Sequence, residues 1–334
     1  MEIRKQQEEW EYKRLSPYAA KSAEAVRDRI EEPCDMRTAY QRDRDRILHS
    51  KAFRRLMHKT QVFLAPEGDH YRTRLTHTLE VAQITRTIAR SLCLNEDLAE
   101  AIALGHDLGH TPFGHAGESA LDKICKKGFI HSEQSVRVVE LLEKKGRGLN
   151  LTREVRDGIR NHQTTGQPKT LEGQIVRITD KIAYINHDID DAIRGQILTE
   201  ADIPKKYTEI LGDSVKKRLD IMIHDVVCNS MDQPKIGMSE EIETAMKGLR
   251  QFMSEHIYRN PKAKSEEGKA KKMITELYYY YMENPDRLPE EYRIFITQNE
   301  QDKEKIVCDY IAGMTDGYSI AVFKSIFVPK SWKL

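Results

Sequence analysis

Cysteine is scarce in this sequence, and its pattern excludes two structural classes. Only five cysteines occur among 334 residues, and none belongs to a Cys-x-x-Cys motif. An odd, scattered set argues against a disulfide framework and against a zinc site built from thiolates. We therefore predict a reducing, cytoplasmic setting, with position 93 in the apolar core. The five are Cys34, Cys93, Cys125, Cys228 and Cys308.

Long apolar runs and an excess of one charge are also absent. No run approaches the roughly 20 residues that span a bilayer, and the charged segment Met1–Trp10 lacks the apolar centre of a signal peptide. We expect no membrane partner. Because 54 Lys and Arg residues balance 53 Asp and Glu residues, nucleic acid stays a possible partner that the charge does not indicate. A local basic pocket for a phosphorylated substrate remains compatible with this balance.

Apolar residues recur at helical spacing through most of the chain. Val81, Ile84, Ile88 and Leu92 follow steps of three and four residues, and no segment shows the sustained alternation of a β-strand. The pattern predicts an all-α protein. Asn95 is a good N-cap for the next helix. Further helices are expected over residues 172–193, 214–229, 239–256, 265–283 and 302–323.

The adjacent pair His106–Asp107 is the most informative feature of the chain. A lone His-Asp pair is usually a surface or capping pair, and two neighbours rarely suffice to bind a metal ion. His77 upstream and Asp180 downstream complete a set of two nitrogens and two oxygens. Such a set leaves open positions for water and substrate. We therefore predict one divalent ion, Mn²⁺, Mg²⁺ or Fe²⁺, held by these four residues.

Histidine clusters around this pair. Five of the twelve histidines lie between positions 77 and 131, and such clustering beside a paired carboxylate favours a functional site. Asp180, Tyr184 and Asp188 recur every four residues, so they share one face of the helix expected over 172–193. That face is either part of the site or an ordinary solvated polar face. The three further histidines are His110, His115 and His131.

The order of these motifs resembles that of the HD-domain metallophosphohydrolases. The run His106-Asp-Leu-Gly-His-Thr-Pro-Phe-Gly-His-Ala-Gly-Glu118 looks like the signature of the deoxynucleoside triphosphate triphosphohydrolases, the dGTPase-like branch. The resemblance spans roughly residues 35 to 325 and is closest to the compact bacterial members. Similar segments are Phe53–Phe63, Arg74–His77, His131–Ser135, Asp180–Tyr184 and Asp309–Asp316.

The resemblance implies a fold and an assembly. We expect an N-terminal helical arm over residues 1–34, an HD-domain helical core over 35–195, and a C-terminal helical region over 196–334 that completes the fold. A homo-oligomer is expected, and the exposed-looking run Tyr278–Tyr281 favours an interface, since aromatic residues are enriched there. A dNTP effector remains possible.

The resemblance also implies an activity, the hydrolysis of dGTP or several dNTPs to deoxynucleoside and inorganic triphosphate. The ion would polarise the α-phosphate and orient the attacking water. By this resemblance, His115 and Glu118 match the family's catalytic pair. The spacing agrees with this role, since a carboxylate three residues away can fix the tautomer of the imidazole and raise its basicity. Whether His115 activates water or protonates the leaving 5′-oxygen stays open. The other matches contact substrate: His110 and the catalytic His131 line the triphosphate, Arg74 and Lys181 contact phosphates, Tyr184 faces the 2′ side of the sugar, and Gln61 and Asp188 hold its 3′-hydroxyl.

Two alternatives remain. The first is another HD-domain phosphohydrolase, such as a nucleotidase or phosphodiesterase, in which His110 and His131 bind a second metal ion. One ion per chain supports the leading hypothesis, and two support this alternative. The second is a nucleotide-sensing or nucleic-acid-binding scaffold. The full ligand set, the His115–Glu118 pair and the balanced charge weigh against a scaffold.

Overall fold

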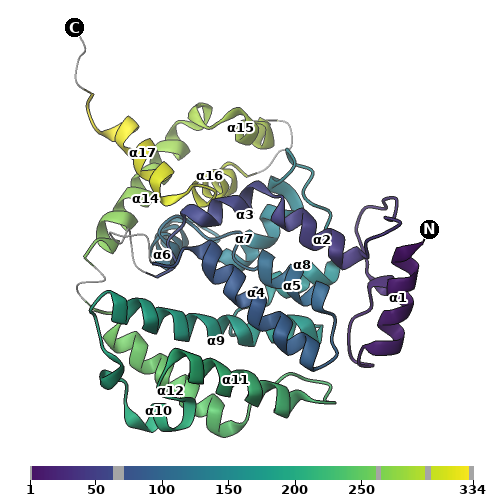
Figure 1. The fold of residues 1–334 in the computed structure, drawn as a ribbon. Coiled ribbons are helices and arrows are strands. Elements are labelled where there is room, and N and C mark those ends of the chain that lie inside the picture. The colour runs from purple at the N-terminus through teal and green to yellow at the C-terminus, as the bar shows by residue number, and fades with distance from the viewer. Residues whose placement is uncertain (1, 63–70, 261–264, 298–301, 331–334) are drawn as a thin grey trace.

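The computed structural model describes residues 2–62, 71–260, 265–297 and 302–330, and these residues form helices and connecting loops (Figure 1). The prediction of an all-α fold is confirmed. Within the described ranges no strand occurs, and β-pairing is limited to one antiparallel bridge between Thr60 and Thr73. No helix in those ranges has the length and apolar character needed to cross a bilayer.

The helices that carry the predicted site residues lie in the first 194 residues of the chain. The first group is α1 (Ile3–Arg14), α2 (Ala39–Leu48), α3 (Lys51–Arg55), α4 (Arg74–Ser91), α5 (Glu96–Gly105), α6 (Gly114–Ile124), α7 (His131–Arg137), α8 (Arg153–Arg160) and α9 (Leu171–Arg194). The second group is α10 (Lys205–Leu211), α11 (Val215–Ser230), α12 (Glu240–His256), α14 (Glu267–Glu283), α15 (Glu290–Thr297), α16 (Lys303–Ala312) and α17 (Asp316–Phe327).

Helix α9 runs through the centre of the molecule, with α4 and α5 on one side and α11 and α12 on the other (Figure 1). Its isoleucines at 175, 182, 185 and 189 are almost completely buried in the main apolar core. Local capping sets the start of its neighbours. The Asn95 side chain accepts a hydrogen bond from Leu98 N at 3.1 Å and begins α5, as predicted. Thr73 caps α4 in the same way.

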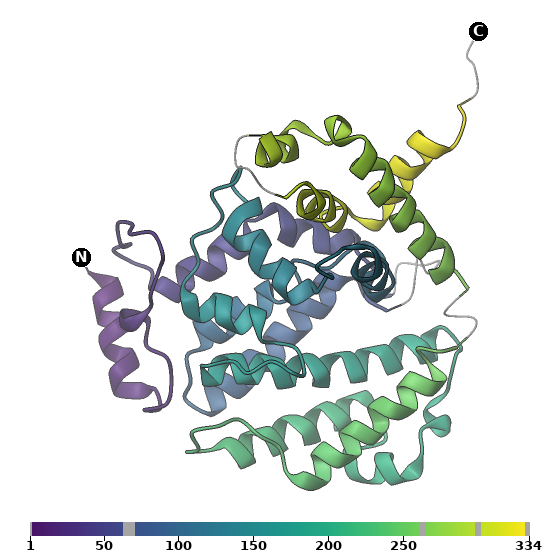
Figure 2. The ribbon, with the colours of Figure 1, turned by 180° about the vertical axis from the view of Figure 1, so that it is seen from behind.

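A second apolar cluster joins α6 to α14, α15 and α16. Helix α17 lies at one edge of the molecule and α1 at the opposite edge, in both views (Figures 1 and 2). The tyrosine run at 278–281 was expected to be exposed, and this expectation is only half right. Tyr278 and Tyr281 are buried in the second cluster, whereas Tyr279 is 51% exposed. The domain boundaries at residues 34 and 195 stay a prediction.

The helix predicted over 302–323 is wrong at its middle. The chain breaks between α16 and α17 because Gly313 ends the first helix, its N–H donating to Asp309 O, and the Thr315 side chain caps the second by accepting from Tyr318 N. Asp316 is therefore the first residue of a new helix. This break decides where the Asp316 carboxylate lies.

Two cysteine predictions also need correction. Cys125, directly after α6, and Cys308 on α16 are joined as a disulfide, which was not expected from scattered cysteines. Their approach follows from the packing of α6 within the second apolar cluster, a contact across 183 residues of sequence. Cys93 is exposed rather than in the core, because α4 ends at Ser91 and the chain turns with a positive φ at residue 93. The reducing, cytoplasmic setting stays a prediction.

Candidate metal centre and substrate cavity

Three helices bring the four predicted metal ligands together. His77 lies in the second turn of α4, His106 and Asp107 follow directly on the end of α5, and Asp180 lies in the middle of α9. His77 Nε2 is 3.1 Å from Asp180 Oδ1. His106 Nε2 is 3.4 Å from Asp107 Oδ1 and 3.7 Å from Asp180 Oδ1. The two nitrogens and two carboxylates therefore face one small volume.

The chemistry of this cluster fits a divalent cation. His106 Nδ1 lies 2.6 Å from Ala103 O, which fixes the ring and turns Nε2 toward the carboxylates. That Nε2 is buried with no hydrogen-bond partner. Burial alone would lower the pKa of His106, but the carboxylates of Asp107 and Asp180 raise it to about 9. Two carboxylates, the buried Asp107 and the partly buried Asp180, thus demand positive charge, which a metal ion supplies more fully than a proton.

A second set of possible ligands adjoins the first. Asp107 Oδ1 also lies 3.4 Å from His110 Nε2 and 3.9 Å from His131 Nε2. These three residues form a group close enough to hold an ion of their own. Burial and then the nearby Arg74 and His131 hold the pKa of His110 well below its ordinary value, so its ring is neutral. The rings of His110 and His131 stack with their centres 3.8 Å apart.

Glu118 on α6 connects two histidines of the site. Its carboxylate lies 3.2 Å from His115 Nδ1 and 2.8 Å from His131 Nδ1, and it also accepts the His131 backbone N–H. Burial would raise the pKa of Glu118, but the hydrogen bonds to the two histidines outweigh it and hold this pKa far below its ordinary value. The carboxylate is therefore ionised and fixes the orientation of both rings. The side chain of His115 is 80% exposed, so it can meet a substrate.

A cavity of about 610 Å³ opens onto these groups. It is lined by all thirteen predicted site residues except His106 and Glu118, which lie behind its wall. Among the buried polar side-chain atoms without a hydrogen-bond partner in the described residues, three belong to cavity-lining residues predicted to hold the sugar: Gln61 Oε1, Tyr184 Oη and Asp188 Oδ1. Buried polar atoms are normally satisfied, so these three point to a polar ligand.

The structure qualifies two of the predicted phosphate contacts. Arg74 lines the cavity, but it is buried and its Nη1 lies 2.5 Å from Asp107 Oδ2. Part of its charge is thus committed to holding a predicted metal ligand. Lys181 is half-buried on α9 and lines the same cavity. Burial, followed by repulsion from Arg177 and Arg250, lowers the pKa of Lys181.

Three further residues of the cavity were not predicted. The Tyr258 hydroxyl donates to Asp188 Oδ2 at 2.6 Å, and burial raises the pKa of Asp188 to about 6. The Arg250 guanidinium lies 5.9 Å from the centre of the Tyr184 ring. His162 Nε2 lies 3.2 Å from His131 Nε2. His162 sits in the segment Asn161-His-Gln, whereas Tyr258 and Arg250 carry no local signal, because only the packing of α12 near α9 places them there.

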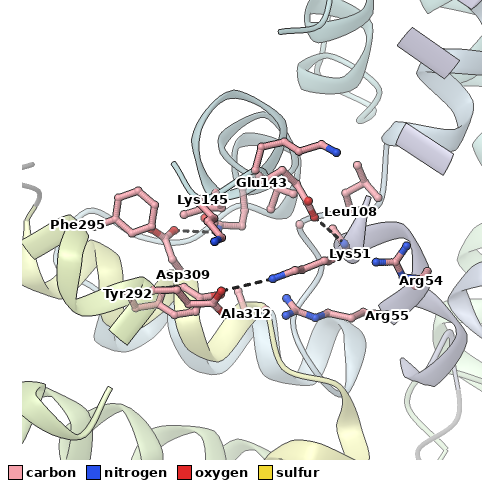
Figure 3. Close-up of a pocket in the computed structure, with 18 of the residues that line it drawn as sticks. Lys51, Arg54, Arg55, Leu108, Glu143, Lys145, Tyr292, Phe295, Asp309 and Ala312 are labelled. Atoms are coloured by element: carbon pink, nitrogen blue, oxygen red, sulfur yellow. Dashed lines mark hydrogen bonds and ion pairs between the residues drawn. The ribbon is translucent and has the colours of Figure 1, made fainter. Parts of the chain in front are cut away.

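A second cavity, of about 680 Å³, lies beside α3, α15 and α16 (Figure 3). Two aromatic rings, Tyr292 and Phe295, border it, and Lys59 reaches from it toward the site. The Lys59 ammonium donates to the backbone carbonyls of His110 and Ala312. Burial lowers the pKa of Lys59 to about 7. The cationic lining residues are Lys51, Arg54, Arg55, Lys59, Lys144, Lys145 and Arg147.

The helical fold and the His/Asp cluster on α4, α5 and α9 define an HD-domain phosphohydrolase. Residues 74–185 match the model of the HD domain, and residues 236–325 match that of the phosphohydrolase-associated domain. The chain is 62% identical to a deoxyguanosinetriphosphate triphosphohydrolase-like protein of Caldanaerobacter subterraneus, over 99% of this chain and 98% of the relative. It therefore belongs to the deoxyguanosinetriphosphate triphosphohydrolase-like family.

Other relatives with the same name are similar over their whole length. A protein of Desulfatibacillum aliphaticivorans is 50% identical over 98% of this chain and 99% of its own. One of Clostridium tetani is 47% identical over 99% and 97%. A solved structure of a hypothetical protein from Aquifex aeolicus is 19% identical with a TM-score of 0.48, covering 85% of this chain and 71% of that chain.

Proposed function

We propose that this protein hydrolyses deoxynucleoside triphosphates to deoxynucleoside and inorganic triphosphate. One observation carries the proposal. A His/Asp cluster suited to one divalent ion lies beside the histidines that Glu118 contacts. Both face a cavity in which several buried polar atoms have no hydrogen-bond partner. The printed name of the relatives, deoxyguanosinetriphosphate triphosphohydrolase-like protein, supports dGTP among the substrates.

In this proposal His77, His106, Asp107 and Asp180 hold the ion. Imidazole nitrogens and carboxylate oxygens without thiolates suit Mn²⁺, Mg²⁺ or Fe²⁺. When bound, the ion supplies Lewis acidity at the α-phosphate. The chain itself supplies orientation, since Ala103 O fixes the His106 ring and Arg74 holds the second oxygen of Asp107.

The exposed His115 is proposed to transfer a proton, with Glu118 as the group that fixes its tautomer and stabilises its charged form. Water attacks the α-phosphorus, the bond from phosphorus to the 5′-oxygen breaks, and the 5′-oxygen takes a proton. His115 either takes the proton from the attacking water or gives a proton to the leaving 5′-oxygen. His131, held by the same carboxylate, and His110 line the triphosphate.

The nucleoside is proposed to occupy the part of the cavity near α9 and α12. Tyr184 packs against the 2′ side of the sugar, and Gln61 and Asp188 hold the 3′-hydroxyl. The single proton of that hydroxyl goes to one of two buried oxygens without a partner, Gln61 Oε1 or Asp188 Oδ1. Tyr258 orients Asp188 by donating to its other oxygen, Oδ2. The Lys181 ammonium and the guanidinium nitrogens of Arg74 other than Nη1, which contacts Asp107, face the phosphates.

Product analysis in ¹⁸O-labelled water tests this proposal. Each of the four dNTPs is incubated with purified protein and a defined ion, and products are separated by chromatography and mass spectrometry. We expect unlabelled deoxynucleoside and triphosphate that carries one label, because water attacks phosphorus. Release of nucleoside monophosphate and pyrophosphate, or no turnover by metal-loaded protein, would refute the proposal.

A second candidate function is supported by the group Asp107, His110 and His131, which could hold a second ion. A nucleotidase or phosphodiesterase would use both ions. Metal content distinguishes the two functions. One Mn²⁺ per chain at saturation favours the triphosphohydrolase, whereas two ions per chain, with the second lost on His110→Ala, favour the alternative.

The basic cavity is proposed as the place where a dNTP effector binds. Its surplus of lysine and arginine suits a triphosphate, and Tyr292 and Phe295 offer rings for a base to stack on. Added non-hydrolysable dGTP should raise the rate of dATP hydrolysis in the parent protein but not in Lys145→Glu. A matched surface variant, Lys206→Glu, should respond like the parent. An unchanged response of Lys145→Glu would exclude this cavity.

A homo-oligomer is proposed as the working assembly. The edge formed by α14 and α17 exposes Tyr279, Tyr318 and Val328, each to about half of its surface. Exposed aromatic and apolar side chains on these two helices favour burial against another copy. Light scattering at micromolar concentration should give a multiple of the 38.7 kDa chain mass, and Tyr318→Glu should lower it. A monomeric parent protein would refute this proposal.

A further inference from the structure

The turn that presents His115 has an unusual backbone. Phe113, a bulky aromatic residue, has φ 62° and ψ 24°, and Gly114 follows with φ 53°. Left-handed conformations cost little for glycine but cost free energy for an aromatic residue, so the surroundings must hold them in place. His115 comes next in the sequence. Its position therefore depends on whatever stabilises this turn.

Two side chains hold the turn. Within the loop the Thr111 hydroxyl donates to Gly114 O at 2.9 Å, and from a distant part of the chain the carboxylate of Asp316 contacts Phe113. Asp316 Oδ1 accepts a hydrogen bond from Phe113 N at 2.9 Å. Phe113 is the N-cap residue of α6, and its own side chain makes no capping hydrogen bond. A carboxylate from a distant part of the chain thus takes the place of a local cap. Its negative charge also suits the N-terminus of α6.

The other oxygen of Asp316 holds a second segment of the site. Asp316 Oδ2 accepts from Thr60 N at 2.9 Å and from the Thr60 hydroxyl. Thr60 directly precedes Gln61, whose buried Oε1 faces the proposed sugar site. The two segments touch, since a Cβ on Gly114 would lie 3.5 Å from the carbonyl oxygens of Thr60 and Gln61. The Asp316 carboxylate thus holds both Thr60, next to Gln61, and Phe113, two residues before His115, although Asp316 does not line the cavity itself.

We propose that Asp316 is a positioning residue, which sets the catalytic histidine at 115 and the sugar-binding glutamine at 61 in register with each other. The break between α16 and α17 makes this possible, because it places Asp316 in the first turn of α17, where Thr315 caps the helix. The Lys59 ammonium donates to Ala312 O at the end of α16 and to His110 O, so it links the break before α17 to the loop that leads to Phe113. The inference rests on the proposed function for its readout.

Asp316→Asn tests the proposal, because an amide keeps the shape but can accept at only one of the two positions. We expect kcat for dGTP to fall by roughly 10²-fold, the loss typical of a misplaced reacting group. Bound metal per chain should stay at the parent level, since none of the metal ligands touches Asp316. Asp302→Asn is the matched control. Asp302 also caps a C-terminal helix, by accepting from Glu304 N, and it touches no residue of the site.

The ratio of kcat/KM for dGTP to that for 2′,3′-dideoxy-GTP, which lacks the 3′-hydroxyl, is a readout that a merely structural role of Asp316 would not change. The parent protein should prefer dGTP, because Gln61 binds the 3′-hydroxyl. Asp316→Asn should shrink this preference in kcat/KM several-fold, whereas partial unfolding would lower both rates equally. Thr60→Val, which removes one donor and leaves the backbone contacts, should have the same effects to a smaller degree and guards against a folding defect in the first variant.

Two results would overturn the inference. One is parent-like kcat and parent-like preference in Asp316→Asn. The other is a lower kcat in both Asp316→Asn and Thr60→Val with an unchanged preference for dGTP over 2′,3′-dideoxy-GTP. Neither result touches the proposed function, which fails instead if the metal-loaded parent protein releases no triphosphate from dGTP.

Discussion

Asp180 Oδ1 lies 3.1 Å from His77 Nε2, across 103 residues of sequence. Helices α4 and α9 pack side by side, and polar residues of each face the other. Thr85 Oγ1 lies 2.6 Å from Thr179 Oγ1, and Glu80 Oε2 lies 3.1 Å from His187 Nδ1. A partly buried carboxylate beside a buried imidazole is costly unless a cation or a proton compensates its charge. The pair is therefore the natural place to test metal binding.

We expect Asp180→Asn to lose the metal ion and nearly all activity, because an amide is a poor ligand for a hard cation. Elemental analysis after dialysis against Mn²⁺ measures the ion, and triphosphate release measures activity. Asp190→Asn, on the same helix and paired with Arg72 at 2.8 Å, is the control and should retain both. Full metal occupancy in Asp180→Asn would contradict the proposed ligand set.

Glu118→Gln should lower kcat by about 10²–10³-fold and change KM little. Glutamine keeps the size of the side chain, but a neutral amide cannot stabilise a protonated His115 or fix both His115 and His131 as acceptor. Steady-state kinetics at saturating Mn²⁺ measure both constants. A parent-like kcat would mean that the carboxylate only braces the loop.

Local patterns predict much of this site, because helix periodicity and capping are local. The helix expected over 172–193 is observed as Leu171–Arg194, and Asn95 caps α5 as predicted. Placing Asp180, Tyr184 and Asp188 on one face needs only the 3.6-residue period. All three line the cavity.

Tertiary contacts account for what the sequence patterns missed. Tyr258 reaches Asp188 only because α12 packs near α9, and no periodicity within either segment reveals it. The break at Gly313 is different, since a glycine followed by Thr315 is a local end-and-start signal. The apolar periodicity on both sides masked it. Without that break the contact from Asp316 to Phe113 is not predictable.

A buried carboxylate in α9 makes a prediction about stability and pH. Glu172 Oε1 accepts from Asn95 N at 3.0 Å and from Ala20 N at 3.1 Å, while its Oε2 is buried without a partner. Burial outweighs these hydrogen bonds and raises the pKa of Glu172 from 4.5 to about 7. The folded protein therefore keeps this proton at pH values where the unfolded chain has lost it. The contribution of Glu172 to the free energy of unfolding is therefore fully present below pH 4.5 and is lost as the pH rises through 7.

Glu172→Gln should remove this loss, because glutamine keeps an acceptor oxygen and never ionises. Relative to the parent protein, its free energy of unfolding should rise between pH 4.5 and 7.5 by up to about 3 kcal/mol. Urea unfolding in EDTA at a series of pH values measures this. Glu241→Gln, at an exposed position of α12, should run parallel to the parent. A constant offset for Glu172→Gln would show that the carboxyl does not titrate in this range.

Tyr184 is expected to exclude ribonucleotides. It lies one helical turn after Asp180, its ring lines the cavity, and its hydroxyl is buried without a partner. A ring against C2′ leaves no room for a 2′-hydroxyl, an effect worth roughly 10²-fold or more in selectivity. Tyr184→Ala should therefore narrow the ratio of kcat/KM for dGTP over GTP, mainly by admitting GTP. Tyr184→Phe keeps the ring and should keep the ratio. If Tyr184→Ala loses activity on both nucleotides in equal proportion, the ring packs the cavity wall and does not select the sugar.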